Sequence, residues 1–392
     1  MRDNFSKWPV FSTEEVKAVS KVLKSGKVNY WTGSECKLFE KEFAEYIGMS
    51  YGISLANGTV ALELALRVLD IGSGDEVIVP ARTFIASASC IIACGARPIV
   101  SDIDVDSQNI TINTIKQVVS KKTKAIIIVH LAGWPCDMDP ILNYAKQRNL
   151  KVIEDCAQAH GACYKGKYVG SFGDAAAFSF CQDKIITTGG EGGMLLLRNR
   201  DLYEKAWAYK DHGKNLNATL RLRSNLTMGF KWTHDSFGTN WRMTEMQAAI
   251  GRIQLRKLDN WVEIRRCNAD ILTRSFQKIS ALRITKSNED FYHSYYKYYV
   301  FIKPNVLKTG VTRDKIVNIL QKLGVPCFVG SCPEIYLEKA FINAGLSPKR
   351  RFKIARELGE TSLVFLVHHR LMKNDMIKMS EIVKKIMNRF TK

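Results

Sequence analysis

Short apolar and β-branched runs recur through the first half of the chain, with helical patterns between several of them. The helical patterns cover Thr59–Leu69, Ile85–Cys94 and Pro140–Gln147. Strands and helices that alternate at this spacing are typical of βαβ units. The sequence therefore predicts an α/β fold with a largely parallel, doubly wound, seven-stranded sheet flanked by helices. The expected strands are Tyr51–Leu55, Glu76–Val79, Pro98–Val100, Ala125–Val129, Lys151–Ile153, Ala175–Phe178 and Met194–Leu197.

The pattern changes near residue 242. Apolar residues from Met243 to Ile264 recur at helical spacing, which predicts one long amphipathic helix. Further along the chain, the run Tyr292–Ile302 predicts a strand. We expect a large α/β domain over residues 1–264, whose first residues are free to pack on the second domain. A smaller α+β domain is expected over residues 265–392.

Composition excludes several classes of protein. The chain has 392 residues with 46% hydrophobic and 24% charged residues, which is the composition of a globular protein and not of a disordered one. The apolar stretch Thr83–Ala96 is shorter than the roughly 20 residues that a bilayer helix needs, and residues 1–4 begin no signal peptide pattern. The ten cysteines form no C-x-x-C pair. We expect a cytoplasmic protein with reduced thiols and no bound metal.

The charge of the chain is strongly positive. Lys and Arg total 58 against 38 acidic residues, giving a formal net charge of +20. The basic clusters are short, and no nucleic-acid-binding motif accompanies them, so we do not expect nucleic acid as a partner. A basic surface also attracts a polyanionic small substrate, such as a nucleotide diphosphate.

Candidate ligand-binding residues follow the first two expected strands. Ligands bind beyond the carboxyl ends of the strands in doubly wound sheets. Gly58 and Thr59 open a helix directly after the first strand, and the free N–H groups at such a helix start can bind a phosphate. Phe84 follows the second strand and could stack on a flat ring. An ordinary helix cap and a core phenylalanine are the alternative interpretations.

Two later strands end in a second group of such residues. Asp155 ends one buried strand, where a carboxylate needs a partner such as a protonated pyridine nitrogen, and Gln158 could reach an adjacent ring oxygen. Ser179 and Lys184 follow another strand, and a closely packed lysine is a Schiff-base nucleophile. A turn-capping Asp and a surface lysine are the alternatives. Together these residues match what pyridoxal phosphate needs.

Six motifs in this order resemble the DegT/StrS sugar aminotransferases, which belong to fold type I of the pyridoxal-phosphate enzymes. The resemblance covers most of residues 10–265, and the block from Asp155 to Gly193 is its most specific part. The motifs are Asn57-Gly58-Thr59-Val60-Ala61-Leu62, Arg82-Thr83-Phe84-Ile85-Ala86, Val129-His130-Leu131-Ala132-Gly133, Glu154-Asp155-Cys156-Ala157-Gln158-Ala159-His160-Gly161, Phe178-Ser179-Phe180 with Lys184 and Gly190-Glu191-Gly192-Gly193, and Asn240-Trp241-Arg242-Met243-Thr244-Glu245.

The resemblance implies a role for each residue. Lys184 would bond covalently to pyridoxal 5'-phosphate and move the proton during catalysis. Asp155 would keep the ring nitrogen protonated, Gln158 would bond the ring hydroxyl, and Phe84 would stack on the ring. Asn240 would reach the phosphate bound by the neighbouring subunit, which makes a homodimer with shared active sites the functional unit. The phosphate ligands within one subunit would be Gly58, Thr59 and Ser179.

The resemblance also implies the substrates. L-glutamate would leave as 2-oxoglutarate, and the resulting pyridoxamine 5'-phosphate would aminate a nucleotide-linked ketosugar. A 4-keto-6-deoxysugar is expected, for the amino sugars of a surface polysaccharide such as the O-antigen of lipopolysaccharide. The segment Cys327–Glu334 departs from the family's pattern where relatives shape the sugar pocket, so the sugar and the nucleotide stay open.

Three alternatives remain at this point. One is a 3-ketosugar aminotransferase. A second is a sugar dehydratase of the same family, but those relatives replace the Schiff-base lysine with histidine and Lys184 is intact here. The third is a non-catalytic regulator that binds pyridoxal phosphate or nucleic acid, which the complete set of site residues opposes.

Overall fold

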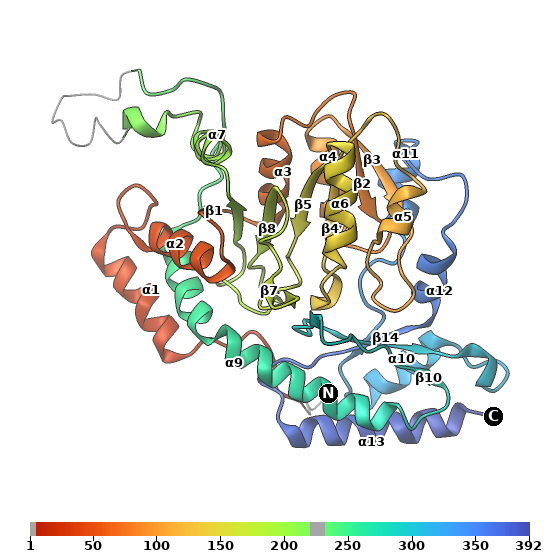
Figure 1. Ribbon diagram of the computed structural model, residues 1–392. Coiled ribbons are helices and arrows are strands. Elements are labelled where there is room, and N and C mark those ends of the chain that lie inside the picture. The colour runs from red at the N-terminus through yellow and green to blue at the C-terminus, as the bar shows by residue number, and fades with distance from the viewer. Residues whose placement is uncertain (1–4, 220–231) are drawn as a thin grey trace.

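The computed structural model describes residues 5–219 and 232–392, and a seven-stranded sheet lies at its centre (Figure 1). The strand order is β1-β9-β8-β5-β4-β2-β3. All strands run parallel except β9, which is antiparallel to both of its neighbours. The predicted α/β fold and all seven predicted strands are confirmed. The strands are β1 (Tyr51–Leu55), β2 (Glu76–Pro80), β3 (Arg97–Ser101), β4 (Thr123–Val129), β5 (Lys151–Asp155), β8 (Ala175–Ser179) and β9 (Gly193–Leu197).

Helices cover both faces of this sheet, because alternate strand residues point to opposite faces and both sets are apolar. Val77 and Val79 of β2 belong to one buried cluster, while Ile78 between them belongs to another. The first cluster lies under α3 (Gly58–Val68), α4 (Ala86–Ala93) and α7 (Arg200–Lys210). The opposite face is covered by α5 (Ile112–Lys116), α6 (Met138–Arg148), α2 (Glu35–Ile47) and part of α9 (Glu245–Phe276).

The longest helix of the described chain is α9, which connects the two parts of the molecule. Its first turn is closed by a capping box in which Thr244 and Gln247 bond reciprocally. Helix α1 (Thr13–Ser25) packs against α9, and so does α13 (Lys373–Phe390). The helix predicted to end at 264 continues to Phe276, so the expected boundary at 264/265 falls within one continuous helix.

The second part of the chain contains a four-stranded antiparallel sheet with the order β10-β12-β14-β13. It forms its own apolar core with the end of α9, with α10 and with α13, and Phe5 of the N-terminal segment packs against this core. Its elements are β10 (Leu282–Arg283), β12 (Tyr298–Ile302), α10 (Arg313–Lys322), β13 (Cys327–Phe328), α11 (Lys339–Asn343), α12 (Lys353–Thr361) and β14 (Ser362–Phe365).

The prediction of one strand over Tyr292–Ile302 is wrong for the first half of this range. Phe291–Tyr292 form β11, which pairs with β6 (Cys163–Tyr164), and β6 pairs in turn with β7 (Lys167–Tyr168). Tyr295 then adopts a left-handed backbone with φ of 47°, which an extended strand cannot include. The apolar run is therefore divided between two sheets.

The described chain also contains 3₁₀ turns at Leu131–Gly133, Pro304–Val306 and Ile335–Leu337. Within residues 5–219 and 232–392, none of the helices combines the length and the apolar character that crossing a bilayer requires.

Candidate active site

A cavity of about 870 Å³ lies at the carboxyl ends of β1, β2, β5 and β8, where the sequence places its candidate residues. The second part of the chain closes its other side with residues of β12, β13 and β14. Of the predicted site residues, Asn240 alone does not line this cavity. Those that line it are Gly58, Thr59, Phe84, Asp155, Gln158, Ser179 and Lys184.

Asp155 ends β5 at the floor of the cavity and is only 5% exposed. Its carboxylate accepts hydrogen bonds from Ser87 Oγ at 2.7 Å and from the Ala157 N–H at 3.1 Å. Burial raises the pKa of Asp155 above its ordinary value, and the bonds from Ser87 and Ala157 only partly offset this. No described residue forms an ion pair with it. A cationic ligand group opposite Asp155 would therefore stabilise its charged form.

The first turn of α3 and the end of β8 approach each other closely beside this carboxylate. A Cβ atom added to Gly58 would lie 2.6 Å from Ser179 Cβ, so only glycine permits the approach. The Asn57 side chain caps the helix by accepting from the Val60 N–H. The preceding N–H groups, of Gly58 and Thr59, stay available beside the Ser179 hydroxyl. This arrangement suits a phosphate group at a helix N-terminus.

Gln158 and Phe84 flank the cavity. Gln158 Oε1 accepts a hydrogen bond from the Ala132 N–H at 2.9 Å, which leaves the two amide N–H donors for a ligand oxygen. Phe84 follows β2 and keeps 66% of its surface exposed, although it is a large apolar side chain. Its ring lines the cavity and offers a stacking surface.

Lys184 lies on the loop between β8 and β9, and its side chain is 17% exposed. Its Nζ is 3.4 Å from Asp183 Oδ1 and 5.1 Å from the centre of the Tyr296 ring. Its backbone carbonyl accepts a hydrogen bond from Trp8 Nε1 at 2.8 Å. Trp8 is in turn in ring contact with Trp261. The backbone of this lysine is therefore held by the distant Trp8, while its amine lies beside its chain neighbour Asp183 and the distant Tyr296.

Asn240 lies outside the cavity of its own subunit. It is exposed, and it pairs in a β-bridge with Asp211. The loop that precedes it carries Trp232 and Phe237, which are 93% and 99% exposed. The role expected of Asn240 toward a neighbouring subunit stays a prediction.

The cavity contains groups that the sequence patterns did not reveal. Ser87 of α4 bonds Asp155, and its only signal is a polar residue on a buried helix face. Tyr296, Lys297 and Tyr299 enter from the second part of the chain. No local motif marks these three, because the fold alone brings β12 to the sheet. Phe328, Gly330 and Ser331 of the segment Cys327–Glu334 also line the cavity.

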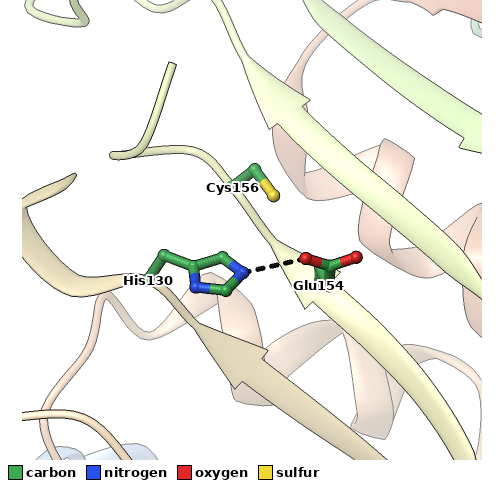
Figure 2. A group of neighbouring side chains, drawn as sticks. All are labelled: His130, Glu154 and Cys156. Atoms are coloured by element: carbon green, nitrogen blue, oxygen red, sulfur yellow. Dashed lines mark hydrogen bonds and ion pairs between the residues drawn. The ribbon is translucent and has the colours of Figure 1, made fainter. Parts of the chain in front are cut away.

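Behind the site, His130, Glu154 and Cys156 form a buried cluster with the composition of a metal site (Figure 2). His130 Nδ1 accepts from the Cys136 N–H, so His130 Nε2 carries the proton and donates to Glu154 at 3.0 Å. Both ring nitrogens are thereby engaged. Burial also raises the pKa of the Cys156 thiol well above its usual range, which opposes the thiolate that a metal prefers. The cluster is structural.

Glu154 has further partners in this cluster. It accepts three N–H groups, from Gly170, Phe172 and Gly173, at 2.7–2.8 Å. Burial alone would raise the pKa of Glu154, but His130 and the N–H groups of Gly170 and Gly173 lower it below its ordinary value. Glu154 therefore joins β4, β5 and the turn before β8, and it anchors the strand that ends in Asp155.

The arrangement fits pyridoxal phosphate. Ser179 and the start of α3 would hold its phosphate, Asp155 would face its ring nitrogen, and the Gln158 amide would donate to its hydroxyl oxygen. Lys184 would supply the amine that bonds its carbonyl carbon. The fold and this site define a fold type I pyridoxal-phosphate enzyme.

The chain belongs to the DegT/DnrJ/EryC1/StrS aminotransferase family, which it matches over residues 9–386. It is 41% identical over 288 residues to GDP-perosamine synthase of Escherichia coli O157:H7, covering 74% of each chain. It is 44% identical over 250 residues to dTDP-3-amino-3,6-dideoxy-alpha-D-galactopyranose transaminase of Aneurinibacillus thermoaerophilus, covering 64% of each. An aminotransferase of Psychrobacter cryohalolentis, known from its X-ray structure, is 50% identical with a TM-score of 0.95, over 98% of this chain and 99% of that one.

These comparisons confirm the family that the motifs indicated. The chain is a sugar aminotransferase, and its cofactor is pyridoxal phosphate.

Replacing Glu154 by Ala should reduce the free energy of unfolding by about 3–5 kcal/mol, because it leaves buried His130 and three N–H groups without their acceptor. Urea unfolding followed by circular dichroism measures this. Glu381→Ala, an exposed acid of α13, is the control and should change stability by less than about 0.5 kcal/mol. Equal losses for the two variants would show that the cluster does not anchor β5.

Replacing Gly58 by Ala should weaken pyridoxal phosphate binding by about tenfold or more, because the new Cβ must push Ser179 away from the start of α3; overpacking of this kind costs about 1–3 kcal/mol. Fluorescence titration of the apoenzyme measures the dissociation constant. Gly72→Ala is the matched control, because its Cβ would meet only Cys94 O at 3.5 Å. Unchanged affinity in Gly58→Ala would contradict the proposed phosphate site.

Proposed function

We propose that this enzyme transfers the amino group of L-glutamate to a nucleotide-linked 4-keto-6-deoxysugar. The observation that carries the aminotransferase chemistry is the shared cavity of Asp155 and Lys184. Asp155 is a buried carboxylate that forms no ion pair within the described chain. Lys184 has its backbone carbonyl held by Trp8 and its amine placed beside Asp183. The similarity to GDP-perosamine synthase supports a nucleotide-linked amino sugar as the product.

Bound pyridoxal phosphate supplies an electron sink that allows an amino acid and a keto compound to exchange an amino group. The residues of the chain make this possible. Asp155 would hold the proton on the ring nitrogen, because burial raises the pKa of Asp155 and its two hydrogen bonds offset this only in part. Lys184 Nζ, once released, would take the proton from the donor's α-carbon and return it, as a general base and then an acid. Phe84 would cover one face of the ring and exclude water there.

A 3-ketosugar is the second candidate substrate. It is favoured by the similarity to a transaminase whose name specifies a 3-amino sugar, although that match covers a smaller share of the chain than the match to GDP-perosamine synthase. The cavity residues from the second part of the chain, such as Phe328 and Ser331, are those we expect to distinguish the two sugars.

The proposal includes a homodimer that works in the cytoplasm. The exposed aromatic loop before Asn240 supports a contact with a second copy, through which Asn240 would reach the other subunit's phosphate. All ten cysteines are free, as is usual for proteins of a reducing compartment. The product would serve the synthesis of a surface polysaccharide such as an O-antigen.

We expect the purified enzyme loaded with pyridoxal phosphate to lose its visible absorbance band when L-glutamate is added. A 4-keto-6-deoxysugar nucleotide should restore the band faster than a 3-keto isomer. Stopped-flow absorbance measures the rates of the two half-reactions separately. Lys184→Ala is the control and should show neither change while it stays folded. If the 3-keto isomer restores the band faster, the second candidate replaces the first.

Asp155→Asn should keep the shape of the side chain but lose its charge. We expect the rate of the glutamate half-reaction to fall by roughly a hundredfold or more, because a buried charge aimed at the reacting system is lost. The same absorbance experiment measures the rate. Asp139→Asn removes a half-exposed carboxylate that pairs with Lys165 and should leave the rate unchanged. A rate for Asp155→Asn near that of the wild type would refute the role of Asp155.

A further inference from the structure

Lys297 is a second amine in the active-site cavity, and nothing in the transfer chemistry above uses it. It is the last residue before β12 and comes from the second part of the chain. Its side chain is 24% exposed, and its Nζ is 4.7 Å from the centre of the Tyr296 ring. Arg265 holds this segment by donating to the backbone carbonyls of Tyr295 and Tyr296.

One carboxylate bridges the two amines of the cavity. Asp183 Oδ1 lies 3.4 Å from Lys184 Nζ, and Asp183 Oδ2 lies 3.9 Å from Lys297 Nζ. The Tyr296 hydroxyl donates to the same carboxylate. The second distance is too long for a hydrogen bond, and no described residue accepts one from Lys297 Nζ. Two cations therefore share one anion, and the donors of Lys297 stay available.

The other acids of the cavity do not neutralise Lys297. Asp155 is bonded to Ser87 and Ala157 at the floor, and Glu191 contacts the Cys181 thiol. Burial, with Arg265 and Lys184 nearby, lowers the pKa of Lys297 to about 8 despite Asp183. A ligand anion beside it would stabilise the charged amine.

The two substrates differ in where they carry negative charge. In an α-amino acid the carboxylate is attached to the carbon whose amino group replaces Lys184. In a nucleotide-linked sugar the diphosphate is attached across the pyranose ring from a keto group at carbon 4. A cation that shares a carboxylate with Lys184 is thus placed for the amino acid's α-carboxylate. The diphosphate would lie further from the reacting carbon.

We propose that Lys297 binds the α-carboxylate of the amino donor, and of the 2-oxo acid that leaves, without binding the sugar nucleotide. This proposal rests on the proposed transamination and adds to it the group that selects an α-amino acid as donor. The ammonium group would donate to the carboxylate while Asp183 stays held by Tyr296.

The first test follows the two half-reactions of the holoenzyme separately in Lys297→Met. The half-saturating concentration of L-glutamate should rise at least about tenfold, the usual cost of losing a hydrogen bond to a charged group. The half-reaction of the pyridoxamine-phosphate form with the ketosugar should change by less than about twofold. Lys297→Arg, which keeps the charge, should recover most of the affinity for glutamate.

A second test measures equilibrium binding and needs no turnover. Calorimetry of 2-oxoglutarate with the pyridoxal-phosphate form, which cannot react with it, should show at least about tenfold weaker binding in Lys297→Met. Lys303→Met removes the same charge from an exposed position beyond β12. It should bind 2-oxoglutarate like the wild type.

The outcomes separate the two proposals. Unchanged affinity for glutamate and 2-oxoglutarate in Lys297→Met would overturn the role of Lys297, and so would an equal loss in both half-reactions. If the wild type performs neither half-reaction, the proposed function fails. The calorimetric comparison of Lys297→Met with Lys303→Met still decides whether Lys297 binds a carboxylate.

Discussion

Two consecutive buried carboxylates at the end of β5 are the constraint on which the site depends. The alternation of a strand sends Glu154 to the face under α6 and Asp155 to the face under α3 and α4. Glu154 is fully satisfied, by His130 and three N–H groups. Asp155 receives two hydrogen bonds and no cation. The fold thus stabilises one charge completely and leaves the other to be stabilised by a ligand.

The rest of the cavity follows from where this strand ends. Because β1, β2, β5 and β8 are parallel, their carboxyl ends meet at one edge, and so do the polar residues that follow them. The close approach of Gly58 to Ser179 joins the start of α3 to the end of β8. A phosphate site and a site for a ring nitrogen are thereby held at a separation that the hydrogen bonds of the sheet determine.

The sequence predicted the parts of the structure that local patterns encode. The seven strands are short apolar runs between turn residues. Asp155 and Ser179 are the last residues of two of them, and Lys184 lies in the loop that follows the second. The prediction failed where tertiary structure decides. A left-handed Tyr295 divides one apolar run between two sheets, and α9 continues past 264 because its later residues are covered by α13. Tyr296 and Lys297 follow Tyr295 and line the cavity from the second part of the chain, and no spacing in the sequence indicates them.

The two parts of the chain contribute different chemistry to one cavity. The central sheet supplies the residues suited to the cofactor, whose structure is the same for every substrate. The second part supplies Lys297, Tyr299 and the segment from Phe328 to Ser331, and the Tyr299 hydroxyl accepts from the Ser331 N–H. From its sequence, this segment is expected to depart from the family's pattern. Such a change can alter the substrate without disturbing Asp155 or Lys184, because the β12–β14 sheet has its own core. Relatives named for GDP-linked and dTDP-linked sugars are consistent with this division.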